Sequence, residues 1–362
     1  MSALPATAPA FDPAEAEAFA DKTLSILNHG AIAAMIAIGH RSGLFDVLAG
    51  LPAATSATIA NAAELDERYV REWLAVMVTG GIVTYAPKGR TYALPAEHAA
   101  CLTRDGALGN LAVYGQFVAL IGSLQDKILE RLESGEGLHY HDYPHFHGMM
   151  AEDSGQTVTG QLFDTILPLV DGIAERLEAG IDVLDAGCGR GGALIAMATR
   201  YPNSRFVGYD LGEDAIRYAE GAARGAGLTN IRFEARDLTG YDERERFDFI
   251  TTFDAVHDQK DPAGLVHGLF GALKPGGVYL MQDIGGSAYL ENNLDFPLAA
   301  FLYAVSLTHC MPVSLGQGGA GLGTMWGWET AEAFLKDAGF TSVACNRLPH
   351  DPMNVWFVSR KP

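Results

Sequence analysis

The 362-residue sequence is long enough for two domains of ordinary size, and its 48% hydrophobic residues can fill a core in each. Its formal net charge of −19 would repel a polyanion such as nucleic acid unless basic side chains were concentrated on one face. Cys101, Cys188, Cys310 and Cys345 are far apart and form no Cys-x-x-Cys pair, which favours reduced thiols in the cytoplasm over a disulfide framework. We expect no apolar run to reach the length of a membrane span.

The first hundred residues are predicted to form a helical domain. Residues 1–13 carry no basic stretch ahead of an apolar block, so we expect a loose tail and not a signal peptide. Apolar residues at helical spacing over 14–43 predict a buried helix, packed within the domain or against a second subunit. Helices at 44–48, 55–62 and 66–79 and a hairpin of strands 82–85 and 91–94 follow. This order over residues 14–100 is typical of a winged helix.

A winged helix can bind DNA, but the charges of this one argue against it. Residues 41–100 contain five basic and six acidic side chains, so this segment has no excess of positive charge. The basic residues are Arg41, Arg68, Arg71, Lys88 and Arg90, and the acidic ones are Asp46, Glu64, Asp66, Glu67, Glu72 and Glu97. We therefore predict that this domain serves dimerisation and that the protein binds no nucleic acid.

Residues 101–178 are predicted to form a helical linker and a lid. Residues 102–132 have a helical apolar pattern, and 164–178 form an amphipathic helix. Between them lies a stretch rich in His and Tyr, 139–147. Its histidines alternate in a loop broken by proline and lack the spacing of a zinc site, so we expect no metal there and favour a substrate-facing lid or a packed linker.

The chain is organised around an apolar strand, 181–186, that ends on a carboxylate and breaks into glycines before a helix. Gly187 and Gly189 allow a sharp turn and a close approach of a ligand to the backbone. Gly187, Gly189 and Gly192 also satisfy the dinucleotide pattern, but Asp185 at the end of the strand would repel a pyrophosphate. An acid at this place suits a cofactor with an ammonium group, and S-adenosylmethionine has one and carries no phosphate.

Further acidic residues follow the next predicted strands. A strand at 204–210 ends on Asp210, whose carboxylate can accept both hydroxyls of a ribose. A strand at 231–238 ends near Asp237, and a strand at 247–253 leads to Asp254. Because ligands collect at the carboxyl ends of parallel strands, these residues are expected to surround one site.

The run 185–191, Asp-Ala-Gly-Cys-Gly-Arg-Gly, resembles the glycine motif of class I S-adenosylmethionine-dependent methyltransferases. The run 271–281, with Leu-Lys-Pro-Gly-Gly, resembles their connection to a fifth strand, and residues 14–100 resemble the N-terminal dimerisation domain of small-molecule O-methyltransferases. The resemblance implies an α/β fold with a Rossmann-like seven-stranded sheet over 179–362, an insertion at 285–330, and a homodimer. It implies S-adenosyl-L-methionine as cofactor, held by Asp185, Gly187, Cys188, Gly189, Asp210, Leu211, Asp237, Leu238, Phe253 and Asp254.

The candidate catalytic residue is His257. His257-Asp258 followed by Asp261 resembles the His-Asp-Trp-Ser-Asp stretch of plant-type O-methyltransferases, whose histidine is a general base, although Gln259 replaces the tryptophan. A neutral imidazole could take a proton from a hydroxyl acceptor, or the ring could only line the pocket. Apolar and aromatic side chains are candidates for the wall of a substrate pocket, namely Tyr143, Phe301, His309, Met311, Met325 and Trp326.

The sequence thus predicts a methyltransferase that acts on a small, partly apolar molecule, most simply by O-methylation. A winged-helix regulator that senses S-adenosylmethionine, a nicotinamide-dependent oxidoreductase and a catalytically silent relative stay open as alternatives. The sequence identifies neither the methyl acceptor nor the atom that is methylated.

Overall fold

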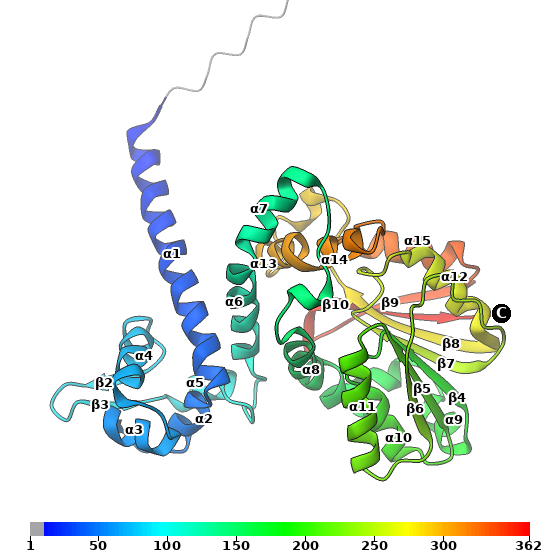
Figure 1. The fold of residues 1–362 in the computed structure, drawn as a ribbon, viewed down its shortest axis with the longest axis horizontal. Coiled ribbons are helices and arrows are strands. Elements are labelled where there is room, and N and C mark those ends of the chain that lie inside the picture. Colours follow the sequence, from blue (N-terminus) through cyan, green and yellow to red (C-terminus); the bar gives the residue numbers. More distant parts are fainter. Residues whose placement is uncertain (1–10) are drawn as a thin grey trace, which may run out of the picture. The chain divides into compact units, whose positions relative to one another are not determined.

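The computed structural model describes residues 11–362, and the chain divides into two compact units (Figure 1). The first ends at Ala119, and the second runs from Leu120 to Pro362. The predicted segment 101–178 spans this division. The predicted tail lies for the most part outside the described residues.

The first unit is a winged helix-turn-helix. Its helices are α1 (Pro13–Arg41), α2 (Leu44–Ala49), α3 (Ser56–Ala63), α4 (Glu67–Thr79) and α5 (Ala96–Leu102). The predicted hairpin is formed by β2 (Thr84–Ala86) and β3 (Thr91–Ala93), and a third short strand, β1 (Ala54–Thr55), pairs with β3. The side chain of Asp66 caps α4 by accepting from the N–H groups of Arg68 and Tyr69.

The core of this unit is built around an aromatic pair. The rings of Phe45 and Trp73 meet edge to face with centroids 5.2 Å apart, and Trp73 Nε1 donates to the carbonyl of Met35 at 2.9 Å. These contacts connect α1, α2 and α4, which explains why the apolar positions predicted for 66–79 face inward.

The N-terminal half of α1 is exposed within its own unit. Apolar side chains on it are exposed in the single chain: Phe19 by 67%, Leu24 by 65% and Leu27 by 66%. Only the C-terminal part of α1, including Ala37, Gly39 and His40, is buried. Within its own unit α1 is therefore buried only near its C-terminal end, and burial of its N-terminal half against a second copy stays a prediction.

Two predicted helices are broken into shorter elements. The run 102–132 contains a 3-10 turn (Leu111–Tyr114), α6 (Gly115–Ser123) and α7 (Gln125–Ser134), because Gly109 has φ +86° and Asn110 caps the new start. The run 164–178 is helical in the regular sense only over α9 (Ile173–Ala179). Pro168 lies in the 3-10 turn ahead of it and Gly172 has φ +71°, so one continuous helix cannot form.

The second unit contains the predicted seven-stranded sheet, in the order β6-β5-β4-β7-β8-β10-β9. Neighbours from β6 to β8 are parallel, whereas β10 is antiparallel to both β8 and β9. Its strands are β4 (Asp182–Ala186), β5 (Arg205–Asp210), β6 (Ile231–Ala235), β7 (Phe247–Phe253), β8 (Leu273–Ile284), β9 (Ser342–Leu348) and β10 (Asp351–Arg360).

Alternate strand residues supply two cores, one on each face of the sheet. Val183 packs with α10 (Gly192–Arg200) and α11 (Glu213–Gly225), whereas its neighbour Leu184 packs with α12 (Pro262–Ala272) and α15 (Trp328–Asp337). The remaining helices are α8 (Phe146–Thr157), α13 (Ala299–Val305) and α14 (Met311–Gly316). The chain moves from β4 to β5 on one side and returns to β7 on the other, so the carboxyl ends of these strands flank a crevice.

Two helical stretches among residues 11–362 are long and apolar enough to cross a membrane when only length and composition are considered. They are Pro13–Arg41 and Ala299–Gly316. This corrects the expectation that no apolar run reaches that length. Buried helices of water-soluble proteins meet the same criterion, so the observation is weak evidence for a span.

Candidate functional site

A cavity of about 460 Å³ lies where the parallel strands end. It is lined by all ten residues that the sequence analysis assigned to a cofactor: Asp185, Gly187, Cys188, Gly189, Asp210, Leu211, Asp237, Leu238, Phe253 and Asp254. They come from the carboxyl ends of β4, β5 and β7 and from the loops that follow β4, β5, β6 and β7. The structure therefore brings these residues together, and their part in binding stays a prediction.

The glycine turn after β4 is held by the next strand. Gly187 (φ +79°) donates its N–H to the carbonyl of Tyr209 at 2.8 Å, and Gly189 (φ +52°) donates to Asp210 Oδ2 at 2.7 Å. A Cβ at Gly187 would lie 2.5 Å from that of Ala255, whereas a Cβ at Gly189 would meet no atom within 4 Å. Position 187 thus needs glycine for packing, and position 189 leaves space beside the cavity.

Asp185 is buried, and no ion pair to it is found among residues 11–362. The residue is only 2% exposed, and its Oδ1 accepts a hydrogen bond from Thr251 Oγ1 at 2.8 Å. Burial raises the pKa of Asp185 to about 7, against the lowering effect of Thr251, and the nearby charge of Asp210 adds to the rise. A cation bound in the cavity would stabilise the ionised form of this carboxylate.

Asp237 and Leu238 follow β6 at another part of the cavity wall. Asp237 Oδ1 accepts the N–H of Thr239 at 2.8 Å, and the hydrogen bonds from Thr239 lower the pKa of Asp237 despite partial burial. An ionised carboxylate there can only accept hydrogen bonds, which suits an exocyclic amine of a ligand. Leu238 is 4% exposed.

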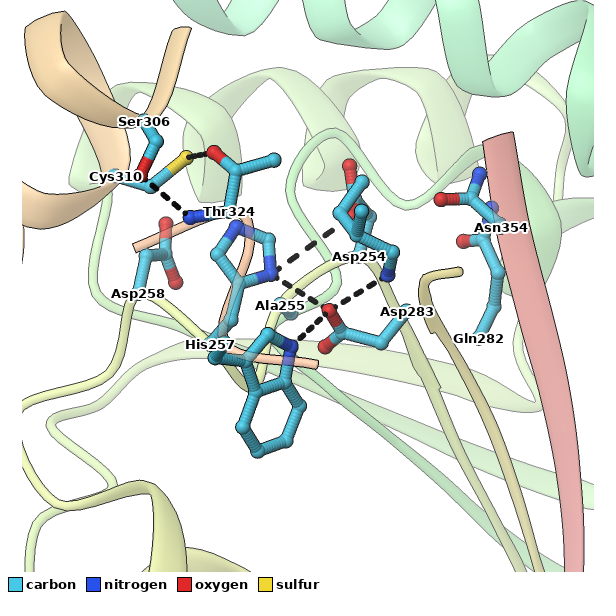
Figure 2. Close-up of polar contacts among 12 residues, drawn as sticks. Asp254, Ala255, His257, Asp258, Gln282, Asp283, Ser306, Cys310, Thr324 and Asn354 are labelled. Carbon is cyan, nitrogen blue, oxygen red and sulfur yellow. Dashed lines mark hydrogen bonds and ion pairs between the residues drawn. The ribbon is translucent and has the colours of Figure 1, made fainter. Parts of the chain in front are cut away.

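His257 lies in a buried charged cluster beside the cavity and is not among the residues that line it (Figure 2). Its Nδ1 is 2.9 Å from Asp283 Oδ1 and 3.8 Å from Asp254 Oδ1. Asp283 Oδ1 also accepts hydrogen bonds from Trp326 Nε1 at 2.9 Å and from the backbone N–H of Ile284 at 2.8 Å. Three donors therefore converge on one buried oxygen.

The protonation of His257 follows from these neighbours. Burial lowers its pKa, but the charge and hydrogen bond of Asp283, together with Cys310, outweigh burial and raise the pKa of His257 well above its usual value. The surroundings therefore favour the protonated ring more than water does. The neutral imidazole that the sequence analysis assumed for a general base forms only at higher pH.

The atoms of Asp254, His257 and Asp283 that could ligate a metal lie within 4.8 Å of one another, the one such group found among residues 11–362. His257 Nδ1 and Asp283 Oδ1 are occupied by their mutual hydrogen bond, and a protonated imidazole does not bind a metal. The histidines of 139–147 form no such group in the described part of the chain.

The histidine-rich stretch contributes to the cavity wall through its aromatic members. Tyr140, Phe146 and His147 line the cavity. The hydroxyl of Tyr140 donates to Asp258 Oδ2 at 3.1 Å, and His147 Nδ1 lies 3.0 Å from Asp214 Oδ2. These contacts hold the start of α8 against the sheet, as a packed lid would be.

The predicted substrate-pocket residues do not line this cavity, and their part in an acceptor pocket stays a prediction. None of Tyr143, Phe301, His309, Met311, Met325 and Trp326 lines it. Tyr143 donates its hydroxyl to the carbonyl of Thr308 at 3.0 Å, and its ring meets His309 edge to face at 4.6 Å. The rings of Phe146 and His309 stack with centroids 3.9 Å apart, and Trp326 Nε1 donates a hydrogen bond to Asp283 Oδ1. Packing among themselves and against the core removes these side chains from the cavity surface.

Comparison with known proteins gives the family of both units. A family model for an Rv2258c-like winged HTH domain matches residues 30–104, and one for a methyltransferase domain matches residues 177–305. The chain joins a winged helix-turn-helix domain to a class I methyltransferase domain. This confirms the predicted family and the predicted fold of the sheet that carries the cavity.

Curated relatives match the methyltransferase domain over part of their length. The chain is 32% identical over 107 residues to a ubiquinone biosynthesis O-methyltransferase of Leptothrix cholodnii, covering 29% of this chain and 45% of that protein. It is 36% identical over 115 residues to 2-heptyl-1-hydroxyquinolin-4(1H)-one methyltransferase of Mycobacteroides abscessus, covering 30% and 48%. The chain thus spans less than half the length of these relatives.

Solved structures match both units of the fold. A Nostoc punctiforme protein named as an O-methyltransferase superposes with a TM-score of 0.71 at 20% identity, covering 98% of this chain and all of that one. Human N-acetylserotonin methyltransferase, solved with SAM, gives 0.66 at 16% identity, covering 98% and 99%. At these identities the likeness establishes the fold.

Three polar residues of the site were missed by sequence reasoning. Asp283 follows Gln282 near the end of β8, so the rule that selected Asp185 and Asp210 could have found it. Gln282 and Asn354 also line the cavity of the methyltransferase domain. Asn354 lies early in β10, an antiparallel strand, and its sequence context gives no signal of a site.

Proposed function

We propose that this protein transfers a methyl group from S-adenosyl-L-methionine to a small molecule. The observation that carries the proposal is the buried Asp185 beside the glycine turn, because this carboxylate suits an ammonium and opposes a pyrophosphate. The same argument disfavours a nicotinamide cofactor. Similarity to O-methyltransferases, among them structures solved with SAM and SAH, supports the assignment.

The residues present fit this cofactor. Gly189 leaves open space where a side chain would stand, and the buried carboxylates of Asp185 and Asp210 face the same cavity. When bound, the cofactor supplies an electrophilic methyl group on a sulfonium. Asp185 would hold the ammonium, Asp210 the ribose hydroxyls, and Asp237 with the N–H of Leu238 the adenine edge.

Catalysis by this chain rests chiefly on placing the acceptor and excluding water. Tyr140 and Phe146 of the 139–157 segment cover the cavity, which keeps solvent from the reacting atoms. For a hydroxyl acceptor, His257 is the proposed base, and Asp283 positions it through Nδ1. Because the pKa of His257 is raised, the base form becomes available as the pH rises, so turnover of a hydroxyl acceptor should increase with pH above neutrality.

Calorimetric titration with S-adenosylhomocysteine, with NAD in parallel, tests the cofactor. We expect one S-adenosylhomocysteine per chain and no heat from NAD. Asp210→Asn, which removes the charge and keeps an acceptor at the glycine turn, should weaken binding. A clear NAD isotherm without one for S-adenosylhomocysteine would replace the methyltransferase assignment by an oxidoreductase.

We further propose that α1 pairs two copies of the chain. Its exposed apolar side chains, Phe19, Leu24 and Leu27, are single-chain features that a second copy would cover. Light scattering after gel filtration should give a dimer for the wild type and a monomer for Leu24→Glu/Leu27→Glu. A monomeric wild type at micromolar concentration would contradict the pairing.

A cytoplasmic location completes the proposal. The four cysteines are free, and Cys188 lines the proposed cofactor cavity. Unpaired thiols persist in a reducing compartment. Fractionation of the producing cells, followed by detection of the protein in the soluble fraction, tests this.

A further inference from the structure

Two buried amide side chains in the cavity wall have oxygens without a hydrogen-bond donor among residues 11–362. Gln282 on β8 is 2% exposed and Asn354 on β10 is 7% exposed, and both line the cavity. Gln282 Oε1 and Asn354 Oδ1 are buried atoms that meet no hydrogen-bond donor among the described residues. Buried acceptors are normally satisfied, so two orphans facing one cavity indicate a missing donor.

Asp351 sets the orientation of both amides. Gln282 Nε2 donates to Asp351 Oδ2 at 3.1 Å, and Asn354 Nδ2 donates to Asp351 Oδ1 at 2.9 Å and to Oδ2 at 3.1 Å. Asp351 is only 1% exposed, and its carboxylate attracts the N–H₂ ends. The oxygen ends therefore point the other way, toward Asp254 in Figure 2.

Asp254 adds a carboxylate to the two oxygens. Its backbone is in the left-handed region (φ +54°), and its N–H donates to the carbonyl of Gln282 at 3.0 Å, which keeps the two residues adjacent. Asp254 Oδ1 is also buried without a hydrogen bond, and its nearest positive group is His257 Nδ1 at 3.8 Å. A non-glycine residue held in this conformation beside a cavity is typical of a binding position.

Gln282 and Asn354 lie apart from the residue assigned to the cofactor ammonium, and Asp254, which the sequence analysis assigned to the cofactor, is assigned here to the acceptor instead. Asp185 is on β4, and β7 lies between β4 and β8, the strand of Gln282. A cofactor ammonium at Asp185 is therefore held on another strand. Among the nearest polar groups, Tyr140 already donates its hydroxyl to Asp258, and His257 donates to Asp283. A donor on a second ligand would satisfy these acceptors.

We propose that Asp254, Gln282 and Asn354 bind a protonated amino group of the methyl acceptor. This inference rests on the proposed methyltransferase function. An ammonium offers three N–H donors and a positive charge, which match two amide oxygens and one carboxylate. A metal ion fits less well, because His257 Nδ1 and Asp283 Oδ1 are already bonded to each other.

The proposal also limits which atom is methylated. A nitrogen bound as an ammonium has no lone pair, so it cannot attack the sulfonium methyl while these residues hold it. The amino group is then an anchor, and another atom of the same molecule accepts the methyl group. A hydroxyl near His257 is the acceptor that the cluster can assist, so the substrate class is an amino-substituted hydroxyl compound.

Calorimetry with matched probes tests the anchor. Tyramine and tyrosol share a phenol and differ in the terminal group, an ammonium in one and a hydroxyl in the other; 3-(4-hydroxyphenyl)propionate carries an anion there. In the full chain saturated with S-adenosylhomocysteine, we expect tyramine to bind about tenfold more tightly than tyrosol, and the anion to bind least. Asp254→Asn should reduce this preference to about onefold. Asp242→Asn, which removes an exposed carboxylate elsewhere, should leave it unchanged.

The outcomes separate the two proposals. If S-adenosylhomocysteine binds but tyramine gives no heat or no advantage over tyrosol, the anchor is refuted and the cofactor assignment stands. If S-adenosylhomocysteine fails to bind while Asp254 still governs a tyramine preference, the anchor stands and the methyltransferase assignment fails. Thermal unfolding shows whether Asp254→Asn is folded, independently of ligand affinity, and Asp254→Ser provides a second test if it is not. One Zn²⁺ bound per chain and lost in Asp254→Asn would refute the ammonium assignment in favour of a metal.

Discussion

Replacement of Asp283 by asparagine should change the charge of His257 more than the shape of the site. Asn keeps an oxygen in place of Oδ1, so the N–H groups of Trp326 and Ile284 retain an acceptor. What is lost is the negative charge 2.9 Å from His257 Nδ1. With that charge gone, burial dominates, and the pKa of His257 should fall from well above its usual value to below it.

The expected cost in stability follows from the burial of the pair. Removing one partner of a buried ion pair costs about 3–5 kcal/mol when the other stays charged. His257 can instead lose its proton, and near pH 7 an imidazole with a pKa around 6.5 is already mostly neutral, so that step costs little. The loss then approaches that of one charged hydrogen bond, and we expect Asp283→Asn to destabilise the protein by about 2 kcal/mol at pH 7.

Urea unfolding from pH 6 to 9, with NMR titration of the His257 ring, measures both effects. The folded-state pKa of His257 is raised, so the pair's contribution is complete below the unfolded value of about 6.5 and is lost as the pH rises through the folded-state pKa. The gap between wild type and Asp283→Asn should therefore narrow at high pH. Trp326→Phe removes a neutral donor from the same oxygen, and its cost should not vary with pH. An unchanged His257 pKa in Asp283→Asn would refute the reasoning.

Three further predictions concern the cavity. Gly187→Ala should destabilise the protein by about 2 kcal/mol in thermal or urea unfolding, because its Cβ would collide with Ala255. Gly189→Ala should mainly weaken the binding of S-adenosylhomocysteine in calorimetry. Equal losses of stability in the two variants would argue against open space at Gly189. Asp185→Asn should weaken the same ligand about tenfold or more and stabilise the ligand-free protein near neutral pH, because a carboxyl with a pKa of about 3.9 when unfolded and about 7 when folded costs stability above pH 4. For a hydroxyl acceptor, kcat/KM should rise with pH above neutrality, and a flat profile under conditions where methyl transfer limits the rate would remove His257 as base.

The parts of the fold that the sequence predicted correctly depend on local rules. Buried parallel strands are continuous apolar runs, and those that end on Asp185, Asp210 and Phe253 were placed within a residue or two of their observed ends. The glycine turn needs positive φ, which glycine alone provides readily, so its position was also readable. For this reason the residues assigned to the cofactor converge on one cavity.

The parts that were predicted poorly depend on contacts between distant segments. Burial of α1 cannot be read from its apolar pattern, because the pattern is the same whether the chain or a second copy covers the helix. Tyr143, His309 and Trp326 are apolar or aromatic enough to line a pocket, and only their packing partners show that they face each other or Asp283 instead. Asn354 lies at the site because β10 pairs antiparallel with β8, and this pairing cannot be read from the residues around Asn354.

Carboxylates at the ends of neighbouring strands couple the two halves of the cavity. The charge of Asp210 raises the pKa of Asp185 and of Asp258, after burial as the main cause, so these groups resist ionising together. Burial, together with the charge of Asp283 and against the lowering effect of His257, raises the pKa of Asp254 to about 7 and the pKa of Asp258 to about 6. A cation at Asp185 would offset the negative potential that Asp258 feels, whereas a cation at Asp254 would do the same from the acceptor side. A positively charged ligand has two opposite effects on the site. It reduces the repulsion between the carboxylate that binds it and the other carboxylates, but it also leaves less negative charge to attract the other ligand.

The sign of the coupling between cofactor and acceptor depends on which of these two effects is larger. Measuring tyramine affinity with and without S-adenosylhomocysteine at two ionic strengths decides it, because direct repulsion between two ligand cations weakens with salt, whereas relief within the buried carboxylates does not.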